Sequence, residues 1–300
     1  MKMTKTEWLA METRLDRVRQ VAEELTANLQ APIDPLSVAK PEGQLLRCRG
    51  GDFRDAFDGQ LEYHPSARCF VMFFNTKYDT GLAPGAHHPR TRFSISHELG
   101  HYFLEKHRAI LLKGGKPHPS RGEFVHDVNL EREADAFAAG LLLPSRLARP
   151  LINEDELSLD AVEQLARHFN TSLVSTALRC VQLSDFPCAV VGLREGTVAW
   201  SVRSPSLVEA GLYPPERGNQ GSRTAAGQWA AFASGAGERA QGSAFAPQWF
   251  RTFDRDDLAH VHVTEHYLPV KTMGTLLVLL TVPEDDVMRD DENESEDDDR

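Results

Sequence analysis

The stretch that decides the fold of this chain is His97-Glu98-Leu99-Gly100-His101. Residues four apart on an α-helix lie about one turn apart on the same face, so His97 and His101 bring two imidazoles together. Two neutral ring nitrogens in this arrangement can hold one Zn²⁺, which favours nitrogen ligands and a tetrahedral shell. Glu98 lies about 100° further round the helix, where its carboxylate can take a proton from a zinc-bound water. This H-E-x-x-H spacing predicts a catalytic metal site on a helix.

The residues that flank this stretch predict a helix packed in a core. Leu99, Tyr102 and Phe103 give the helix an apolar side. A motif that arises by chance on a solvated surface helix lacks such a side. The flanks therefore favour a metal site over a chance match.

A second predicted helix supplies a third ligand, which a catalytic zinc site needs besides its open position. This helix covers Leu130–Ala139, has a strongly helix-forming composition and ends near a proline. Glu131 and Asp135 share one face of it with Ala134 and Ala138. The two small residues would let this helix approach the first one closely, and Gly100 would do the same from the other side.

We predict different roles for the three carboxylates of the second helix. We expect Glu131 to be the third ligand and Asp135 to accept the free N–H of His97, which fixes the tautomer of that ring. Glu133 lies about 200° from Glu131 around the helix. We therefore predict that Glu133 is a solvated charge near the helix start, where the macrodipole favours it.

In these segments, the chain resembles the ImmA/IrrE family of zinc metallopeptidases. The likeness runs from about Leu61 to Pro144. It is carried by the motif, by the strand-like Phe70–Asn75, by Arg92-Phe93-Ser94 before the motif, and by Glu131–Ala139 after it. The last segment is also similar to the third-ligand segment of thermolysin-type enzymes. Two loops rich in Pro and Gly, one before the motif and one between the two helices, lengthen the compact family pattern.

The resemblance implies a zincin-like domain with a small mixed sheet and active-site helices. It also implies a zinc endopeptidase in which Glu98 is the general base. Relatives of this kind are regulatory proteases with few substrates. The substrate is often a helix-turn-helix transcriptional repressor whose cleavage releases stress-response or mobile-element genes, so a repressor is the expected partner.

The formal net charge of −11 is concentrated at the C-terminal end of the chain. Residues 284–300 hold 11 acidic and 2 basic residues, which leaves a net charge of −2 for the other residues. A run of this kind cannot bury apolar surface, so we expect 284–300 to be a disordered acidic tail.

Signals for the compartment point to the cytoplasm. The N-terminus has no apolar signal core, and Lys5–Leu29 reads as a charged amphipathic helix. The apolar run Leu276–Leu280 is too short to cross a bilayer. The four cysteines form no C-x-x-C pair and indicate free thiols in a reducing compartment. We expect no membrane partner.

The predicted fold class is α+β, with four parts along the chain. A metallopeptidase domain with an N-terminal helix is expected over 1–150, and a helical segment over 151–184. A small α+β accessory or sensor-like domain follows over 185–283, and then the tail over 284–300. Composition changes and turn signals set these boundaries.

Several strands are predicted from turn signals and apolar runs. Residues 45–75 read as short strands, of which Cys69–Phe74 is either a sheet edge that pairs with an extended substrate or a plain core strand. A hairpin is expected around Glu195-Gly196, and further strands follow nearer the C-terminus. Gly218–Gly242, rich in Gly, Ala and Ser, reads as a loop.

Residues 156–183 resemble a helix-turn-helix pair split by Asn170-Thr171-Ser172. The bases there are Arg167 and Arg179, against five acidic residues in and just before the pair. Phosphate binding needs a clustered positive face. The segment is therefore expected to pack or to dock a partner, and direct nucleic-acid binding is not expected.

A second metal site is conceivable where His260, His262 and His266 alternate onto one strand face. No carboxylate shares that face between them, because Glu265 points the other way. Solvated histidines are the favoured interpretation.

Zinc-dependent hydrolysis of a peptide bond in a protein is the function that these residues support best. His97, His101 and Glu131 would hold the metal. A second oxyanion donor is expected, and His118 or His126 could supply it. Two other classes stay open: a catalytically silent protein that grips a partner, which the intact general base disfavours, and a DNA-binding regulator acting through 156–183, which the local charge disfavours.

Overall fold

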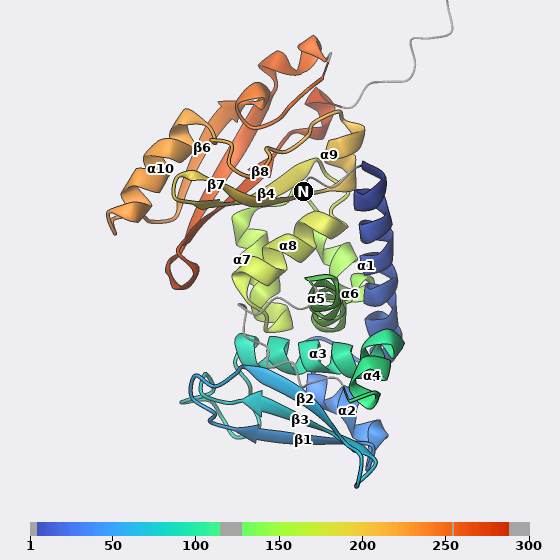
Figure 1. Ribbon diagram of the computed structural model, residues 1–300. Helices are drawn as coiled ribbons and strands as arrows, with labels where there is room; N and C mark the ends of the chain where they lie inside the picture. The colour runs from blue at the N-terminus through green and yellow to red at the C-terminus, as the bar shows by residue number, and fades with distance from the viewer. Residues whose placement is uncertain (1–4, 115–127, 254, 288–300) are drawn as a thin grey trace, which may run out of the picture. The chain divides into compact units, whose positions relative to one another are not determined.

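The structure is a computed structural model, and it describes residues 5–114, 128–253 and 255–287 of the chain (Figure 1). The chain divides into two compact units. One comprises Met1–Ala148 and Leu165–Ser175, and the other comprises Arg149–Gln164 and Thr176–Arg300. Helices and two sheets confirm the predicted α+β class. The roles assigned to the four parts of the chain stay predictions.

A three-stranded mixed sheet lies in the first unit. β1 (Leu46–Gly51) pairs in parallel with β3 (Cys69–Asn75), and β2 (Gly59–His64) pairs antiparallel with the other side of β3. β3 is therefore the central strand, with β2 at an edge of the sheet. Of the two roles considered for Cys69–Phe74, the core strand is the one observed, and burial from both faces explains its run of Phe and Val. The strand that could pair with a substrate is β2.

In the first unit, α3 lies on this sheet and α5 packs against α3 (Figure 1). The motif helix α3 contacts β2 and β3 on one side and α5 on the other, and α1 packs against α5. All residues of α3 from Ile95 to Tyr102 are buried, as the apolar flanks predicted. The helices are α1 (Lys5–Leu25), α2 (Pro35–Ala39), α3 (Pro89–Phe103), α4 (Glu105–Leu112) and α5 (Val128–Leu142).

Three helices follow along the chain: α6 (Ser145–Ile152), α7 (Leu159–Phe169) and α8 (Leu173–Leu183). The predicted break between two helices at Asn170-Thr171-Ser172 is confirmed. Asn170 has a φ of 52°, a left-handed conformation that asparagine tolerates better than most residues. Short 3₁₀ turns lie at Lys40–Glu42, Ala246–Gln248, Asp256–His260, Lys271–Met273 and Glu284–Asp286.

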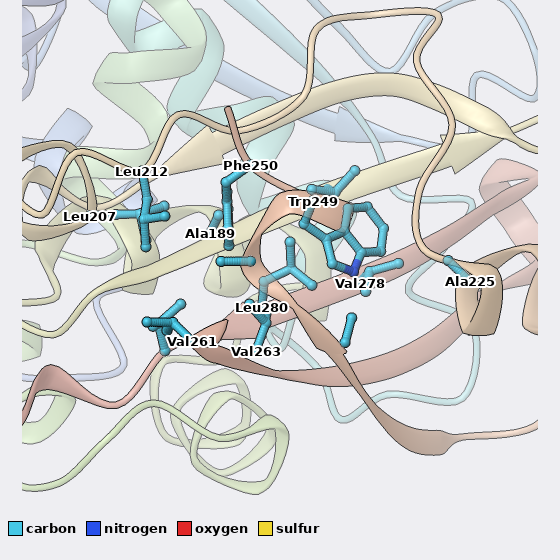
Figure 2. Close-up of a cluster of buried hydrophobic side chains, with 14 of the residues drawn as sticks. Ala189, Leu207, Leu212, Ala225, Trp249, Phe250, Val261, Val263, Val278 and Leu280 are labelled. Atoms are coloured by element: carbon cyan, nitrogen blue, oxygen red, sulfur yellow. The ribbon is translucent and has the colours of Figure 1, made fainter. Parts of the chain in front are cut away.

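The second unit is built on a five-stranded antiparallel sheet in the order β5-β4-β8-β7-β6. Glu195 and Gly196 both have positive φ and join β4 to β5, which confirms the predicted hairpin. Trp249 and Phe250 lie among the aliphatic side chains of its core (Figure 2). The elements are β4 (Cys188–Arg194), β5 (Thr197–Arg203), α9 (Pro205–Glu209), α10 (Arg223–Ala233), β6 (Ala240–Phe245), β7 (His262–Val270) and β8 (Thr275–Thr281).

Two predictions for this unit were wrong in part. Gly218–Gly242 is not a loop throughout, because it contains α10 and the start of β6. The Ser222 hydroxyl caps α10 by accepting from the N–H of Ala225, and the alanines inside the helix favour helical structure. Val287, which was assigned to the acidic tail, is 2% exposed and belongs to the core. The tail beyond it lies outside the described residues.

None of the helices in the described ranges is long and apolar enough to pass through a lipid bilayer. All four cysteines are free thiols, as predicted. Three of them are buried and Cys48 is half-buried.

Candidate metal centre

The motif helix α3 and the helix α5 approach each other closely at Gly100. A Cβ atom at this position would lie 3.2 Å from the Cα of Ala134 and 3.2 Å from the Cβ of Phe137. Both distances are tighter than ordinary van der Waals contacts. The predicted close approach through Gly100 and the small face of α5 is thus confirmed, and it brings the carboxylates of α5 to the motif.

Three candidate ligands converge between these two helices. The ligand atoms of His97, His101 and Glu131 all lie within 4.8 Å of one another. The two histidine Nε2 atoms are 3.1 Å apart, and the Glu131 carboxylate oxygens lie 3.2 Å from His97 Nε2 and 3.6 Å from His101 Nε2. Two nitrogens on one tetrahedral zinc ion are separated by about 3.3 Å. Two imidazoles and a carboxylate in this arrangement fit one such ion.

Asp135 contacts the ring nitrogen of His97 that is not the candidate ligand atom: Asp135 Oδ1 lies 2.9 Å from His97 Nδ1. An N–H on Nδ1 that donates to this carboxylate leaves the Nε2 lone pair directed at the candidate metal position. Burial lowers the pKa of His97, but the hydrogen bonds with Asp135 and Glu131 outweigh it and raise the pKa to about 10. A metal ion must therefore displace a proton from His97 when it binds at neutral pH.

The Nδ1 atom of His101 contacts another histidine, His107. His101 Nδ1 lies 3.0 Å from His107 Nδ1, and His107 Nε2 lies 2.7 Å from the Glu133 carboxylate. Glu133 also pairs with the guanidinium of Arg14 on α1. The prediction that Glu133 is a solvated charge was wrong, because Glu133 is only 4% exposed. Burial lowers the pKa of His107 more than Glu133 raises it, which keeps the ring neutral near pH 7.

Glu98 is 1% exposed and lies against the edge strand β2. A Cβ atom at Gly59 would be 2.8 Å from Glu98 Oε1, so the carboxylate occupies the space that the glycine leaves. A cavity of about 20 Å³ lies beside it, lined by Glu98, His101, His107, Glu131 and apolar residues that include Leu61. A water molecule needs about 10–15 Å³ of such space. The cavity has room for one water between the candidate base and the candidate ligands.

Comparison with known proteins places this site in a family. Residues 74–181 match the model of a family named as a peptidase and described as the IrrE N-terminal-like domain. This segment is an IrrE N-terminal-like domain. The match covers the motif helix and the third-ligand helix, and it confirms the resemblance found in the sequence.

Two further comparisons concern the whole chain. No curated protein sequence matches it. A solved structure described as a Mycobacterium tuberculosis transcriptional regulator shares its fold, with a TM-score of 0.52 and 12% sequence identity. The alignment covers 90% of this chain and 79% of that chain. At this identity the likeness concerns the fold alone.

Arg92 anchors the motif helix of the IrrE-like domain. Its guanidinium is buried and donates to the carbonyl oxygens of Ile33, Phe169 and Asn170. One side chain therefore ties α3 to the end of α7 and to the segment before α2. This contact gives a structural reason for the arginine that precedes the motif.

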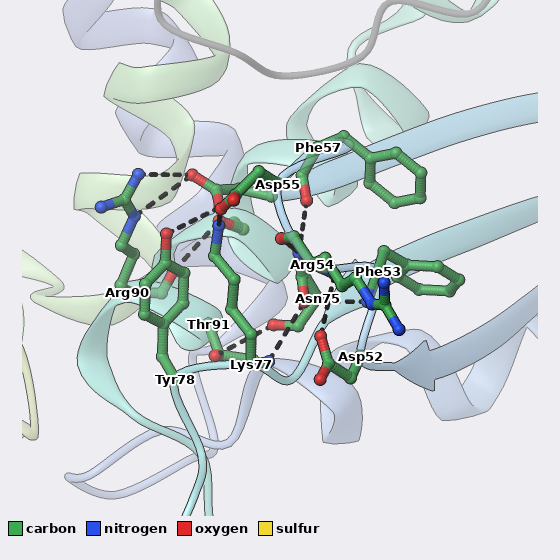
Figure 3. A network of polar contacts seen from close by, with 12 residues as sticks. Asp52, Phe53, Arg54, Asp55, Phe57, Asn75, Lys77, Tyr78, Arg90 and Thr91 are labelled. Atoms are coloured by element: carbon green, nitrogen blue, oxygen red, sulfur yellow. Dashed lines mark hydrogen bonds and ion pairs between the residues drawn. The ribbon is translucent and has the colours of Figure 1, made fainter.

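Asn75, which sequence reasoning did not single out, holds the loop that leads to Gly59 (Figure 3). Its amide nitrogen donates to the carbonyls of Arg54 and Phe57 at 2.7 Å each, and its oxygen accepts from two backbone N–H groups. Asp58 next to it accepts from Arg90 at the start of α3. These bonds fix the β1–β2 loop and so set the position of the edge strand beside Glu98.

The remaining predicted residues lie elsewhere. His118 and His126, the candidates for a second oxyanion donor, lie outside the described residues. His260 and His262 are exposed and His266 is half-buried. Within 5–114, 128–253 and 255–287, the trio on α3 and α5 is the one group of three His, Cys, Asp or Glu side chains that converges on a metal-sized space.

Proposed function

We propose that this chain is a zinc-dependent endopeptidase with a zincin-like catalytic domain. The observation that carries the proposal is the convergence of His97, His101 and Glu131 on one metal-sized space, with the buried carboxylate of Glu98 beside it. Site residues of these types, in a domain matched by a peptidase family, support hydrolysis of a peptide bond.

Glu98 has a defined task in this reaction. Zinc, when bound, would act as a Lewis acid that lowers the pKa of a water and polarises the substrate carbonyl. Glu98 takes a proton from the water while the water oxygen attacks the carbonyl carbon. Glu98 later gives that proton to the nitrogen of the leaving amine. Gly59 and the β1–β2 loop keep the carboxylate in place, and the apolar walls of the cavity strengthen its interactions by limiting solvent.

The edge strand β2 is the proposed binding edge for an extended substrate. One side of β2 pairs with β3, and no strand within the described residues pairs with its other side, so the main-chain groups there could pair with a peptide. β2 begins at Gly59 beside Glu98, so a peptide along it passes the candidate metal site. A pocket of about 220 Å³ lies at the far end of β2, lined by Glu62–Pro65, Leu111 and Leu112 among others. Substrate side chains would enter there.

The proposed substrate is a helix-turn-helix transcriptional repressor, and the proposed role is regulation of transcription in the cytoplasm. The family resemblance supports this assignment. The neighbour in the fold comparison is described as a transcriptional regulator, which agrees with a regulatory setting without identifying a substrate.

DNA binding through 156–183 is the weaker alternative. Arg179, one of the two bases in that segment, is 4% exposed and cannot reach a phosphate. The acidic side chains of Asp160 and Glu163 lie on α7 and pair with Arg239 within the second unit. A surface of this charge opposes the phosphate backbone. The other alternative, a catalytically silent binding protein, does not explain why Glu98 is buried beside the candidate ligands.

The test compares cells that produce the wild-type chain with cells that produce Glu98→Gln at the same level. Glutamine keeps the shape of the side chain but cannot accept a proton. Both proteins should bind about one zinc ion per chain. New protein N-termini should appear with the wild-type chain alone, in a proteome-wide survey of N-termini. Identical sets of N-termini for the two proteins would reject the peptidase assignment and favour the silent binding protein.

A further inference from the structure

The two candidate histidine ligands are supported in different ways. His97 Nδ1 contacts a carboxylate, that of Asp135. His101 Nδ1 instead contacts the imidazole of His107, which in turn contacts the carboxylate of Glu133. His107 was not singled out by the sequence. It stands six residues after His101 on α4, beyond the end of the motif helix.

The order of hydrogen bonds defines where each proton lies. The Glu133 carboxylate, already paired with Arg14, accepts, so His107 Nε2 carries the N–H of this bond. The Nδ1 atom of a neutral His107 ring is then an acceptor. His101 must therefore carry its own N–H on Nδ1, facing His107 at 3.0 Å. This tautomer leaves the His101 Nε2 lone pair facing His97 and Glu131.

We propose that His107 and Glu133 are positioning residues that fix the tautomer and the ring orientation of His101 for metal binding. The inference rests on the proposed function for the identity of the metal, but the chain of contacts stands by itself. The converging group is His97, His101 and Glu131, whereas the two ring nitrogens of His107 face His101 and Glu133.

The hydrogen bonds from His101 through His107 to Glu133 form a relay, and this relay is buried. The side chains of His107 and Glu133 are 1% and 5% exposed, so the hydrogen bond between them is shielded from bulk water. An imidazole that loses its partner in such a place can rotate or change tautomer, and each change removes the lone pair from the metal position. Arg14 extends the relay to α1, which lies outside the segment matched by the family model. The N-terminal helix thus contributes to the centre.

The experiment measures zinc affinity by chelator competition for the full-length chain and four variants. His107→Phe and Glu133→Leu remove the hydrogen bonds. His107→Gln keeps an acceptor and a donor, because the amide oxygen can accept from His101 and the amide nitrogen can donate to Glu133. Leu141→Ala is the matched control, since it removes buried volume from α5, the helix of Glu133, but no hydrogen bond. A long-range ¹⁵N–¹H spectrum of the metal-free proteins reports the tautomer of His101 directly.

We expect zinc affinity to fall about tenfold to hundredfold in His107→Phe and Glu133→Leu, the range typical of lost outer contacts to metal ligands. His107→Gln should recover much of this loss, and Leu141→Ala should bind zinc like the wild type. The Nδ1–H tautomer of His101 should dominate in the wild type and in His107→Gln, and be lost in His107→Phe. Wild-type affinity and tautomer in His107→Phe would overturn the inference. If the wild-type chain binds no zinc, the proposed function fails, and the tautomer measurement still decides the positioning role.

Discussion

Gly59 and Glu98 are in direct contact: the Cα of the glycine on β2 faces the carboxylate of the glutamate on α3, and no Cβ fits between them. A sheet edge and the motif helix therefore fix the candidate base together. The glycine is required here by the close approach and not by its backbone angles, because its φ is not in the left-handed region.

Gly59→Ala should displace the Glu98 carboxylate, because the new Cβ would lie 2.8 Å from Oε1. We expect turnover of a cleaved substrate to fall by about a hundredfold, as small misplacements of catalytic groups do. Zinc content should not change, since the carboxylate is not a ligand. Gly227→Ala is the control, because nothing lies within 4 Å of a Cβ at that position of α10. Normal turnover in Gly59→Ala would show that Glu98 tolerates displacement and is not the base.

Removal of the candidate ligands should abolish metal binding. The purified chain should carry about one zinc ion, and His97→Ala or His101→Ala should carry none. Asp135→Asn should weaken zinc binding by about tenfold to hundredfold, because it weakens the bond that orients His97. His262→Ala, which changes an exposed histidine of β7, serves as the control. Full zinc occupancy in the His97→Ala and His101→Ala double variant, measured by metal analysis, would refute the site.

The local part of this site could be predicted from the sequence, because helical periodicity alone places side chains on a common face. Spacing within one helix paired His97 with His101, and the face of a second helix selected Glu131. The structure brings these three together. Helix contact through small residues was also predictable, since Gly100 has no side chain to keep α5 away.

The non-local part could not be predicted in the same way. His107 reaches His101 because the chain turns at Leu104, whose extended backbone separates α3 from α4 without a glycine or proline to signal it. Glu133 is buried because α1 and α4 cover the face of α5 that the sequence assigned to solvent. The sheet order likewise depends on pairing between distant residues, which places β3 rather than β2 in the centre.

The C-terminal end of the core can be tested by two truncations. A chain that ends at Pro283 lacks Val287, whereas a chain that ends at Val287 keeps it. Val287 is 2% exposed in the core of the second unit, so its loss should lower the free energy of unfolding by about 1–3 kcal/mol. Denaturant unfolding of both truncated chains measures the difference. Equal stability would mean that Val287 does not contribute to the core.

The pH dependence of the metal-free chain follows from His97. The pKa of this residue is raised from 6.5 to about 10 by Asp135 and Glu131, which outweigh the opposing effect of burial. A group whose folded-state pKa is raised stabilises the fold fully below its unfolded pKa and loses this contribution as the pH rises through the folded value. Stability of the metal-free chain should therefore decline between pH 6.5 and about 10. The zinc-loaded chain should not show this decline through His97, because its Nε2 is then bound to metal and carries no proton.

Zinc affinity should change with pH in the direction opposite to the stability of the metal-free chain. A proton must leave His97 before Nε2 can bind the metal, so zinc affinity should rise with pH until about 10. Binding near pH 7 should release about one proton from this residue, which calorimetry in two buffers of different ionisation enthalpy can count. In Asp135→Asn the carboxylate that raises the pKa is absent, so the pKa of His97 should fall. Both the decline in metal-free stability and the proton release at pH 7 should then diminish. If stability and proton release show the same pH dependence in Asp135→Asn as in the wild type, His97 is not the group that titrates.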